Sequence, residues 1–508
     1  MSSFFSNDTA VAGQDKPASG VRIFYAAGIL MSGFLMVYAA QGDLWLDEIW
    51  SILFVETAKT PWEILSVYKN DSNHILNTIF LYLIGKQQNL LFYRMFAILS
   101  GIGSLVLLIK IASRWGHLES MFVLLLAGTS YPLILYFSEA RGYAPAILFS
   151  LLSLYLLHES HIRPGPVKLV LFWIVSILGF LAHLTFIIVF LSLVVYIIHY
   201  EFSVDRTFII KSWQVVKYLS VPAVFIISFY FSYIRDIAIG GGPHVDKYAE
   251  LVRGITCLLG LPESLWFAGL LIIALLLSFV AYMAYADKKP IWSFYLSVLI
   301  IVPAVVITVT NPAYFHFRYI IVCFPYYYLI VSFILAKTWR ANKKITYVAV
   351  LIIGLYIAGQ SLRLWPLFQY GRGSYQAIIS EMANASAANV IIVGSDNDFR
   401  NRAVLFFYAR FLRGGKTIQY VDQASWSIQP PEWLILHSLD EFTEPEPLIK
   451  ILTDRTYRLI KTEKFSGNSG FSWFLYHESN QSNMVSLNDT SMSDAHTGER
   501  KRSDGHVY

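Results

Sequence analysis

The sequence predicts a polytopic α-helical membrane protein that ends in a small α/β domain. Of its 508 residues, 56% are hydrophobic and only 14% are charged, and the mean hydropathy is +0.52. An ordinary globular chain is about 25% charged. The apolar residues fall in blocks of roughly 20, the length of a helix that spans a bilayer core. After about residue 366 these blocks give way to shorter patterns that are typical of strands and a surface helix.

The composition also excludes several classes of function. The chain has two cysteines, Cys257 and Cys323, both in apolar surroundings, so we expect neither a disulfide framework nor a thiolate metal site. The formal net charge is +5 and the pI is about 8.8. The cations are scattered through the loops, as the positive-inside rule expects, and this favours membrane topology over a nucleic-acid partner.

The spans are predicted from the apolar blocks. Residues 1–20 are expected to form a cytoplasmic segment and residues 21–365 the membrane domain. The first block, Val21 to Ala40, is too long for the apolar region of a cleaved signal, about 7 to 15 residues, so we interpret it as a retained span. About 11 spans are expected by length. They begin near Val21, Leu91, Leu118, Tyr143, Val167, Leu184, Val215, Ser264, Ile291, Tyr319 and Ile345.

The cations orient these spans, because cation-rich loops face the cytoplasm. Those loops carry Lys110, Arg114, Arg163, Lys168, Arg206, Lys211, Lys217, Lys288, Lys289, Lys337, Arg340, Lys343 and Lys344. The assignment requires that His74 to Gly85, apolar but only about 12 residues long, is an interfacial or re-entrant helix and not a span. Pro61 to Leu65 is the start of an amphipathic surface helix. Residues 42–90 then form a large extracytoplasmic first loop.

That loop carries two adjacent carboxylates, Asp47 and Glu48, directly after the first span. An ionised carboxylate is costly in hydrocarbon, so acids at a membrane boundary usually face water, a partner charge or a substrate. We predict a reaction centre at this pair. A solvated loop is the alternative.

Four further polar clusters fall on the same predicted face. They are Ser138 to Tyr143, His183, Gly240 to His244, and His316 to Tyr319. Each has a structural alternative: a histidine at a helix end can cap it, an arginine can anchor the helix at the interface, and Glu139 can pair with Arg141. The convergence of acids, imidazoles and guanidiniums at one membrane surface favours a catalytic site.

Residues 366–478 are predicted to form an α/β domain on the same side, since an odd number of spans precedes them. The expected elements are strands at 389–394 and 433–437, a helix at 400–412, and a closing hairpin at 457–465 and 472–477. The loop Ser395 to Asp398 follows a strand, where ligand loops occur, although a plain turn is favoured. Residues 479–508 read as a disordered tail.

These residues resemble those of bacterial membrane glycosyltransferases of the GT-C fold, the group that includes lipid A aminoarabinose transferases and protein O-mannosyltransferases. Asp47 and Glu48 with Trp50 are similar to the group's first-loop acidic motif, and Asn73-His74 to its histidine-proline-proline segment, although Ile75-Leu76 replaces the prolines. Ser138 to Tyr143 resembles its glutamate-alanine-arginine-x-tyrosine motif, and Phe317-Arg318-Tyr319 its arginine-tyrosine signature. The resemblance extends from about Val21 to Tyr476, whereas the loop Gly240 to His244 has no counterpart.

The resemblance implies transfer of a sugar from a polyprenyl-phosphate donor to an envelope acceptor (glycolipid, polysaccharide or protein). The reaction would occur on the extracytoplasmic face of the inner membrane, with inversion at the anomeric carbon. Asp47 would be the base and Glu48 would orient it or the acceptor. Residues expected to bind the donor phosphate or substrate are Arg141, Arg318, Glu139, His74, Tyr143, Tyr319, His316 and His183.

Guanidiniums suit a phosphate leaving group, because they fork onto its oxygens and stay charged. No metal or other cofactor is expected, since relatives with monophosphate donors generally need none. A transporter or lipid-linked sugar flippase is the main alternative, although transporters usually place their charges near the bilayer midplane. A nonenzymatic scaffold is a weaker one.

Overall fold

The computed structural model describes residues 19–239, 246–287, 289–312, 314–341, 343–451 and 455–479. The predicted loop Gly240 to His244, most of the N-terminal segment and all but one residue of the predicted tail lie outside these ranges. The chain divides between Arg372 and Gly373 into two compact units.

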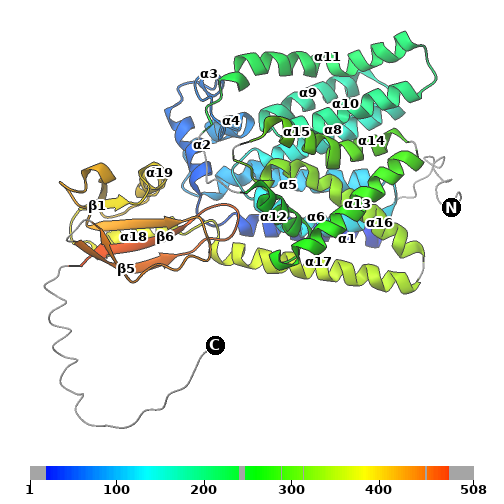
Figure 1. Cartoon of the computed structure of the whole chain (residues 1–508). Coiled ribbons are helices and arrows are strands. Elements are labelled where there is room, and N and C mark those ends of the chain that lie inside the picture. Colours follow the sequence, from blue (N-terminus) through cyan, green and yellow to red (C-terminus); the bar gives the residue numbers. More distant parts are fainter. Residues whose placement is uncertain are drawn as a thin grey trace, which may run out of the picture. The chain divides into compact units, whose positions relative to one another are not determined.

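The first unit is helical, and a helix lies at each predicted span, although fewer of these helices qualify as spans than the roughly 11 expected (Figure 1). They are α1 (Ser19–Ala39), α5 (Leu91–Ala112), α6 (His117–Gly128), α7 (Tyr131–Phe137), α8 (Tyr143–Ile162), α9 (Pro166–Ala182), α10 (Phe186–Ser203), α11 (Phe208–Ser232), α12 (Lys247–Leu259), α13 (Trp266–Ala286), α14 (Pro290–Leu296), α15 (Val302–Thr310), α16 (Phe324–Ala341) and α17 (Lys343–Tyr370). Within the described ranges, eight helical segments are long and apolar enough to cross a membrane. The protein is therefore a multi-pass membrane protein.

The count reaches nine if α6 and α7 form one span, which is bent by 67°. The bend lies where Pro132 opens α7 and the Ser130 hydroxyl accepts from the backbone N–H of Leu133 at 3.4 Å. Proline lacks the N–H that would continue the preceding helix. With 17 residues, α9 is among the shorter apolar helices.

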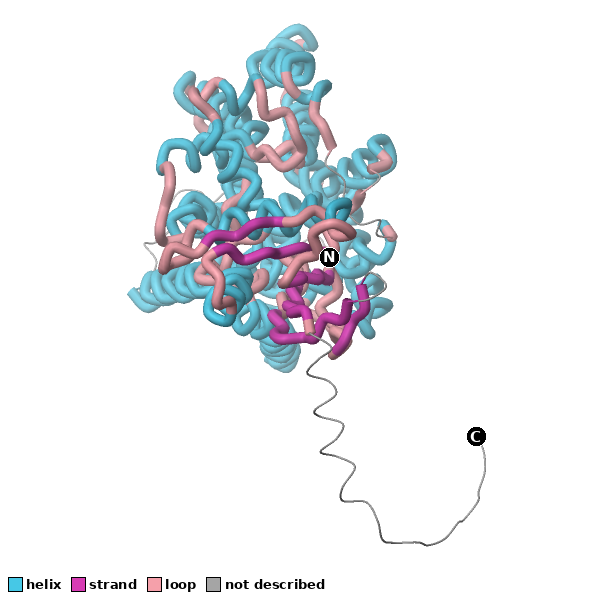
Figure 2. The backbone as a smooth tube through the Cα atoms, turned by 90° about the vertical axis from the view of Figure 1, so that its left-hand side faces the viewer, coloured by secondary structure: helices cyan, strands magenta, loops and turns pink. Residues whose placement is uncertain are grey.

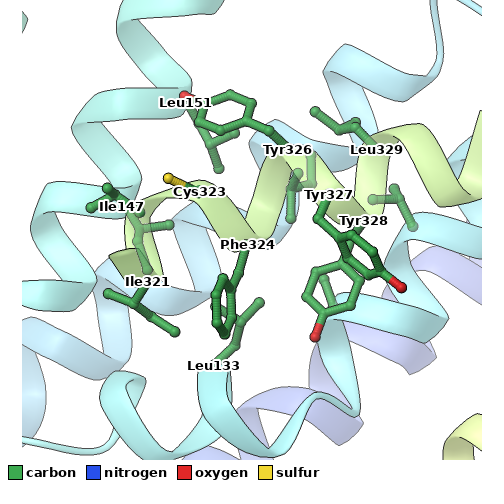
Figure 3. Close-up of a cluster of buried hydrophobic side chains, with 14 of the residues drawn as sticks. Leu133, Ile147, Leu151, Ile321, Cys323, Phe324, Tyr326, Tyr327, Tyr328 and Leu329 are labelled. Atoms are coloured by element: carbon green, nitrogen blue, oxygen red, sulfur yellow. The ribbon is translucent and has the colours of Figure 1, made fainter. Parts of the chain in front are cut away.

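The core of this unit lies around α7, α8 and α16 (Figure 3). All seven residues of α7 are buried, and 72% of the apolar stretch that includes α16 is buried inside the protein. The corresponding share of α1 is 11%, so α1 lies at the periphery. Leu133, Ile147 and Phe324 are among the packed side chains of the core. Close packing here fixes the ends of α7 and α8, between which the 138–142 loop runs.

The predicted first loop is more helical than expected. It contains α2 (Leu46–Thr57), α3 (Glu63–Ser66) and α4 (Ile75–Ile84). Asp47 and Glu48 lie in the first turn of α2, where carboxylates interact favourably with the helix dipole, and not in an irregular loop. With 10 residues α4 is too short to span, as predicted, and α3 is a single turn.

The second unit is an α/β domain with a six-stranded sheet, drawn as the magenta strands in Figure 2. Its elements are α18 (Tyr375–Ala385), β1 (Val390–Ser395), α19 (Asp398–Ala409), β2 (Thr417–Tyr420), β3 (Trp433–Ser438), β4 (Leu448–Ile451), β5 (Arg455–Glu463) and β6 (Ser472–Glu478). The strand order is β2-β1-β3-β6-β5-β4, with β2, β1 and β3 parallel and the remaining pairings antiparallel.

Each predicted strand corresponds to a strand of the sheet, and the predicted helix corresponds to α19. The sequence reading missed α18 and the strands β2 and β4, which have four residues each and lie at the two edges. The loop Ser395 to Asp398 is a helix cap, because Asn397 Oδ1 accepts from the backbone N–H of Arg400 at 3.0 Å.

Candidate active site

The centre of the site is a single carboxylate that faces two guanidiniums. Asp47 Oδ2 lies 2.9 Å from Arg141 Nη1 and 3.8 Å from Arg318 Nη1. The side chains are 14%, 5% and 15% exposed, respectively. We call these three residues the open cluster, because the longer contact leaves Arg318 with unused hydrogen-bonding capacity. No described residue accepts from Arg318 Nε.

Trp45, the residue before α2, makes cation–π contacts with both Arg141 and Arg318. Its ring centroid lies 5.5 Å from Arg141 Cζ and 5.9 Å from Arg318 Cζ. These are cation–π distances, and they bring the guanidiniums together despite their like charge. Trp45 is 8% exposed, so it is buried within the site.

Glu48, next to Asp47, has a different environment. Arg94, on α5, binds its carboxylate at both oxygens, with 2.8 Å from Nε to Oε1 and 2.6 Å from Nη2 to Oε2. The same guanidinium donates to the carbonyls of Ala40, Gly42 and Asp43 at 2.7–2.9 Å. Both side chains are fully buried. Burial alone would raise the pKa of Glu48, but the Arg94 guanidinium outweighs it and holds that pKa below its ordinary value.

Glu48 also joins two loops. Its Oε1 accepts from the backbone N–H of Ala140 at 2.7 Å, and its Oε2 accepts from that of Trp45 at 3.2 Å. Both carboxylate oxygens are thus saturated by protein donors. The sequence placed Glu48 among the catalytic residues, and that role stays a prediction; the geometry favours a supporting role, because both oxygens already accept from protein donors.

The loop 138–142 is held by a second buried pair. Glu139 Oε1 accepts from Arg372 Nε at 3.3 Å, and both side chains are fully buried. Arg372 also donates to the carbonyls of Ala39 and Leu135, each at 2.9 Å. Glu139 therefore helps to hold the loop through Arg372 and not through an ion pair with Arg141, while its Oε2 has no hydrogen-bond partner among the described residues. We call the Glu48/Arg94 and Glu139/Arg372 units the closed pairs.

Gly142 is required where this loop passes the end of α9. A Cβ atom at this position would lie 1.9 Å from the Ala182 carbonyl oxygen. His183 follows Ala182 directly. Because Gly142 has no side chain, the 138–142 loop can approach the segment that carries His183.

His74, His183 and Tyr143 form a wall of packed rings beside Arg141, in which the two imidazoles are stacked and Tyr143 is tilted against them. The His183 centroid lies 4.6 Å from that of His74 and 4.4 Å from that of Tyr143. Arg141 Nε donates to His74 Nε2 at 3.2 Å, and Arg141 Cζ lies 5.0 Å from the Tyr143 centroid. Burial, followed by the nearby cations, holds the pKa of His74 well below its ordinary value and lowers that of His183 to about 3. Both rings are therefore neutral.

His316 lies beside the open cluster but is turned to another acid. Its Nδ1 is 3.4 Å from Glu250 Oε2, on α12, and Glu250 also accepts from the backbone N–H of Phe317 at 3.4 Å. Tyr319 lies under Arg318, with 5.8 Å from its centroid to Arg318 Cζ. His316 thus belongs to the support of the segment that carries Arg318.

The structure brings Asp47, Arg141, Arg318, His74, His183, Tyr143 and Tyr319 together. Sequence reasoning missed Arg94 and Arg372. Arg94 could have been found, because a charge inside an apolar block is by default a functional candidate. No group of three or more His, Cys, Asp or Glu that could hold a metal occurs within the described ranges.

Comparison with known proteins bears on the fold. No protein-family model matches the chain, and no curated protein matches it. The crystal structure of ArnT from Cupriavidus metallidurans in the apo state superposes with a TM-score of 0.53 at 11% identity, covering 83% of this chain and 93% of that chain. The same protein bound to undecaprenyl phosphate gives a TM-score of 0.47 at 12% identity over the same shares. The likeness to apo ArnT confirms the predicted GT-C-like fold with a small C-terminal α/β domain.

Proposed function

We propose that this protein, which has the ArnT fold, transfers a sugar from a polyprenyl-phosphate donor to an acceptor of the cell envelope, with inversion of the anomeric carbon. The observation that carries the proposal is the open cluster, in which two arginines share one carboxylate. The charges leave one net positive charge next to a neutral ring wall. Such a site suits a phosphate better than a neutral ligand.

The arginines would stabilise the leaving group. As the bond from the anomeric carbon to the phosphate oxygen breaks, its electron pair passes to a phosphate that gains negative charge. A guanidinium forks onto phosphate oxygens and keeps its own charge. Arg318 supports this role most directly, since its one described carboxylate contact is 3.8 Å long.

Asp47 would take the proton of the acceptor hydroxyl or amine as the new bond to the anomeric carbon forms. It is the partly exposed carboxylate of the site, at 14%, whereas Glu48 and Glu139 are fully buried in the closed pairs. A single displacement from the face opposite the phosphate needs only one carboxylate and inverts the configuration. We propose no metal for this step.

We further propose that the site faces the extracytoplasmic side of the inner membrane, where the loop between α1 and α5 would lie under the positive-inside rule. The acceptor would be a glycolipid, a polysaccharide or a protein side chain.

The test is a transfer assay with the full chain in lipid, a panel of radiolabelled polyprenyl-phosphate sugars and a crude envelope acceptor fraction. Wild type should transfer label from at least one donor, and Asp47→Asn should not. Asp71→Asn, an isosteric change at an exposed acid of the same loop, is the matched control and should stay active. No transfer from any donor, or equal transfer by Asp47→Asn, would contradict the proposal and favour a transporter or flippase.

A further inference from the structure

His183 contributes an unused hydrogen-bond donor to the ring wall. It lies between the end of α9 and the start of α10 and is 9% exposed. Both rings that it packs against, His74 and Tyr143, contact Arg141. His183 is therefore one ring away from the open cluster.

The tautomer of His183 follows from its hydrogen bonds. The backbone N–H of Thr185 points at His183 Nδ1 at 3.1 Å, and the Thr185 hydroxyl lies 2.9 Å from the same atom. A backbone N–H can only donate, so Nδ1 must carry a lone pair. The proton of the neutral ring is then on Nε2. No residue within the described ranges accepts from that Nε2–H.

The charge of the site distinguishes two forms of phosphate. Asp47, Arg141 and Arg318 together carry one net positive charge. The closed pairs add nothing to it, because each pairs one carboxylate with one guanidinium. A sugar phosphodiester carries a single negative charge. The phosphomonoester released by transfer approaches two, since its second pKa is about 6. A cationic ring at position 183 would raise the charge of the site and favour the product.

We propose that His183 is a neutral hydrogen-bond donor to the phosphate of the donor lipid, held in this tautomer by Thr185. Its neutrality matches the site to the phosphodiester and limits retention of the polyprenyl phosphate product. This inference rests on the proposed function. Thr185 is a positioning residue, which acts only through His183.

Three substitutions at position 183 separate donation from charge. His183→Gln keeps an uncharged N–H donor and should keep a donor KM close to that of wild type. His183→Leu removes the donor and should raise the donor KM about tenfold with little change in kcat, the loss of one hydrogen bond to a charged partner. His183→Lys adds a charge and should lower the inhibition constant of undecaprenyl phosphate about tenfold or more.

A spectroscopic readout tests the tautomer apart from activity. Nitrogen NMR of protein labelled at histidine should show a neutral ring protonated at Nε2 at pH 7, assigned by its disappearance in His183→Gln. Thr185→Pro removes the backbone N–H at a residue whose φ is already −63°, and it should increase the share of the Nδ1–H tautomer. Thr185→Val keeps that N–H and should keep the wild-type signal. A charged ring, or one protonated at Nδ1 in wild type, would overturn the inference.

The outcomes distinguish this inference from the proposed function. If wild type transfers sugar but His183→Leu has the same donor KM, or His183→Lys the same product inhibition, only the role of His183 is wrong. If wild type neither transfers sugar nor binds undecaprenyl phosphate, both are wrong.

Discussion

The open cluster and the closed pairs use the same two kinds of charge in opposite ways. In the closed pairs each carboxylate has its own arginine, and all four side chains are fully buried. In the open cluster one carboxylate serves two arginines, and each side chain keeps some exposure. Asp47 and Glu48 are adjacent in the chain, yet they belong to different arrangements. The difference separates charges that hold the loops from charges available to a ligand.

The largest expected effect is on turnover at the open cluster. Asp47→Asn should lower kcat by about 10² to 10⁴, the range for loss of a general base, while the melting temperature stays near that of wild type. Transfer rates test the predicted fall in kcat, and thermal unfolding of the purified protein tests the unchanged melting temperature. A variant that loses stability as well as activity would place Asp47 with the closed pairs.

The closed pairs should respond in stability first. Arg94→Leu leaves Glu48 buried without its main partner and should lower the free energy of unfolding by about 3 to 5 kcal/mol. The double variant Glu48→Gln with Arg94→Leu should recover much of that loss, because no charge is then left unpaired. Thermal or denaturant unfolding in a lipid-like environment measures the difference. Full activity and stability in Arg94→Leu would contradict the assigned support role.

A smaller change sharpens the comparison within the open cluster. Arg318→Lys keeps the charge but loses the planar fork, so the donor KM should rise about tenfold. The matched change at an exposed arginine, Arg235→Lys, should leave the KM unchanged. If Arg318→Lys matches wild type, point charge alone accounts for the site.

The last effect concerns the pH dependence of stability and the ring wall, and it is small near neutral pH. The pKa of His183 is lowered to about 3 in the folded protein, by burial and then by Arg141 and Arg318, from about 6.5 when unfolded. Below pH 6.5 the unfolded chain binds a proton that the folded ring does not, so stability falls as the pH drops toward 3. Stability should fall by up to about 1.4 kcal/mol per pH unit from this group, and His183→Gln should flatten the slope between pH 6.5 and 5. An unchanged slope would mean that the ring is already charged in the fold.

Much of the fold could be read from the sequence because both of its signals are periodic. Apolar blocks locate the helices of the first unit, and alternating patterns locate β1, β3, β5 and β6. The edge strands β2 and β4 escaped because four residues with one half-buried face give too short a pattern. The helix α2 escaped because the motif residues at its start were interpreted as a loop.

The site was predicted by residue type, but its division of labour was not. Asp47, Arg141 and Arg318 come together as their common face suggested. That Glu48 and Glu139 are structural depends on Arg94 and Arg372, which are 46 and 233 residues away along the chain. No local pattern encodes such long-range partners.

The Arg372 contact has a consequence for how the protein is made. Arg372 follows the last long helix, α17, and it donates to the carbonyl of Ala39, at the end of the first helix, and pairs with Glu139 between them. Glu139 therefore gains its arginine partner only after nearly three quarters of the chain has been synthesised. A nascent chain that stalls before Arg372 lacks one of the two closed pairs, so the 138–142 loop, which carries Arg141, gains its full support only once the membrane unit has been synthesised.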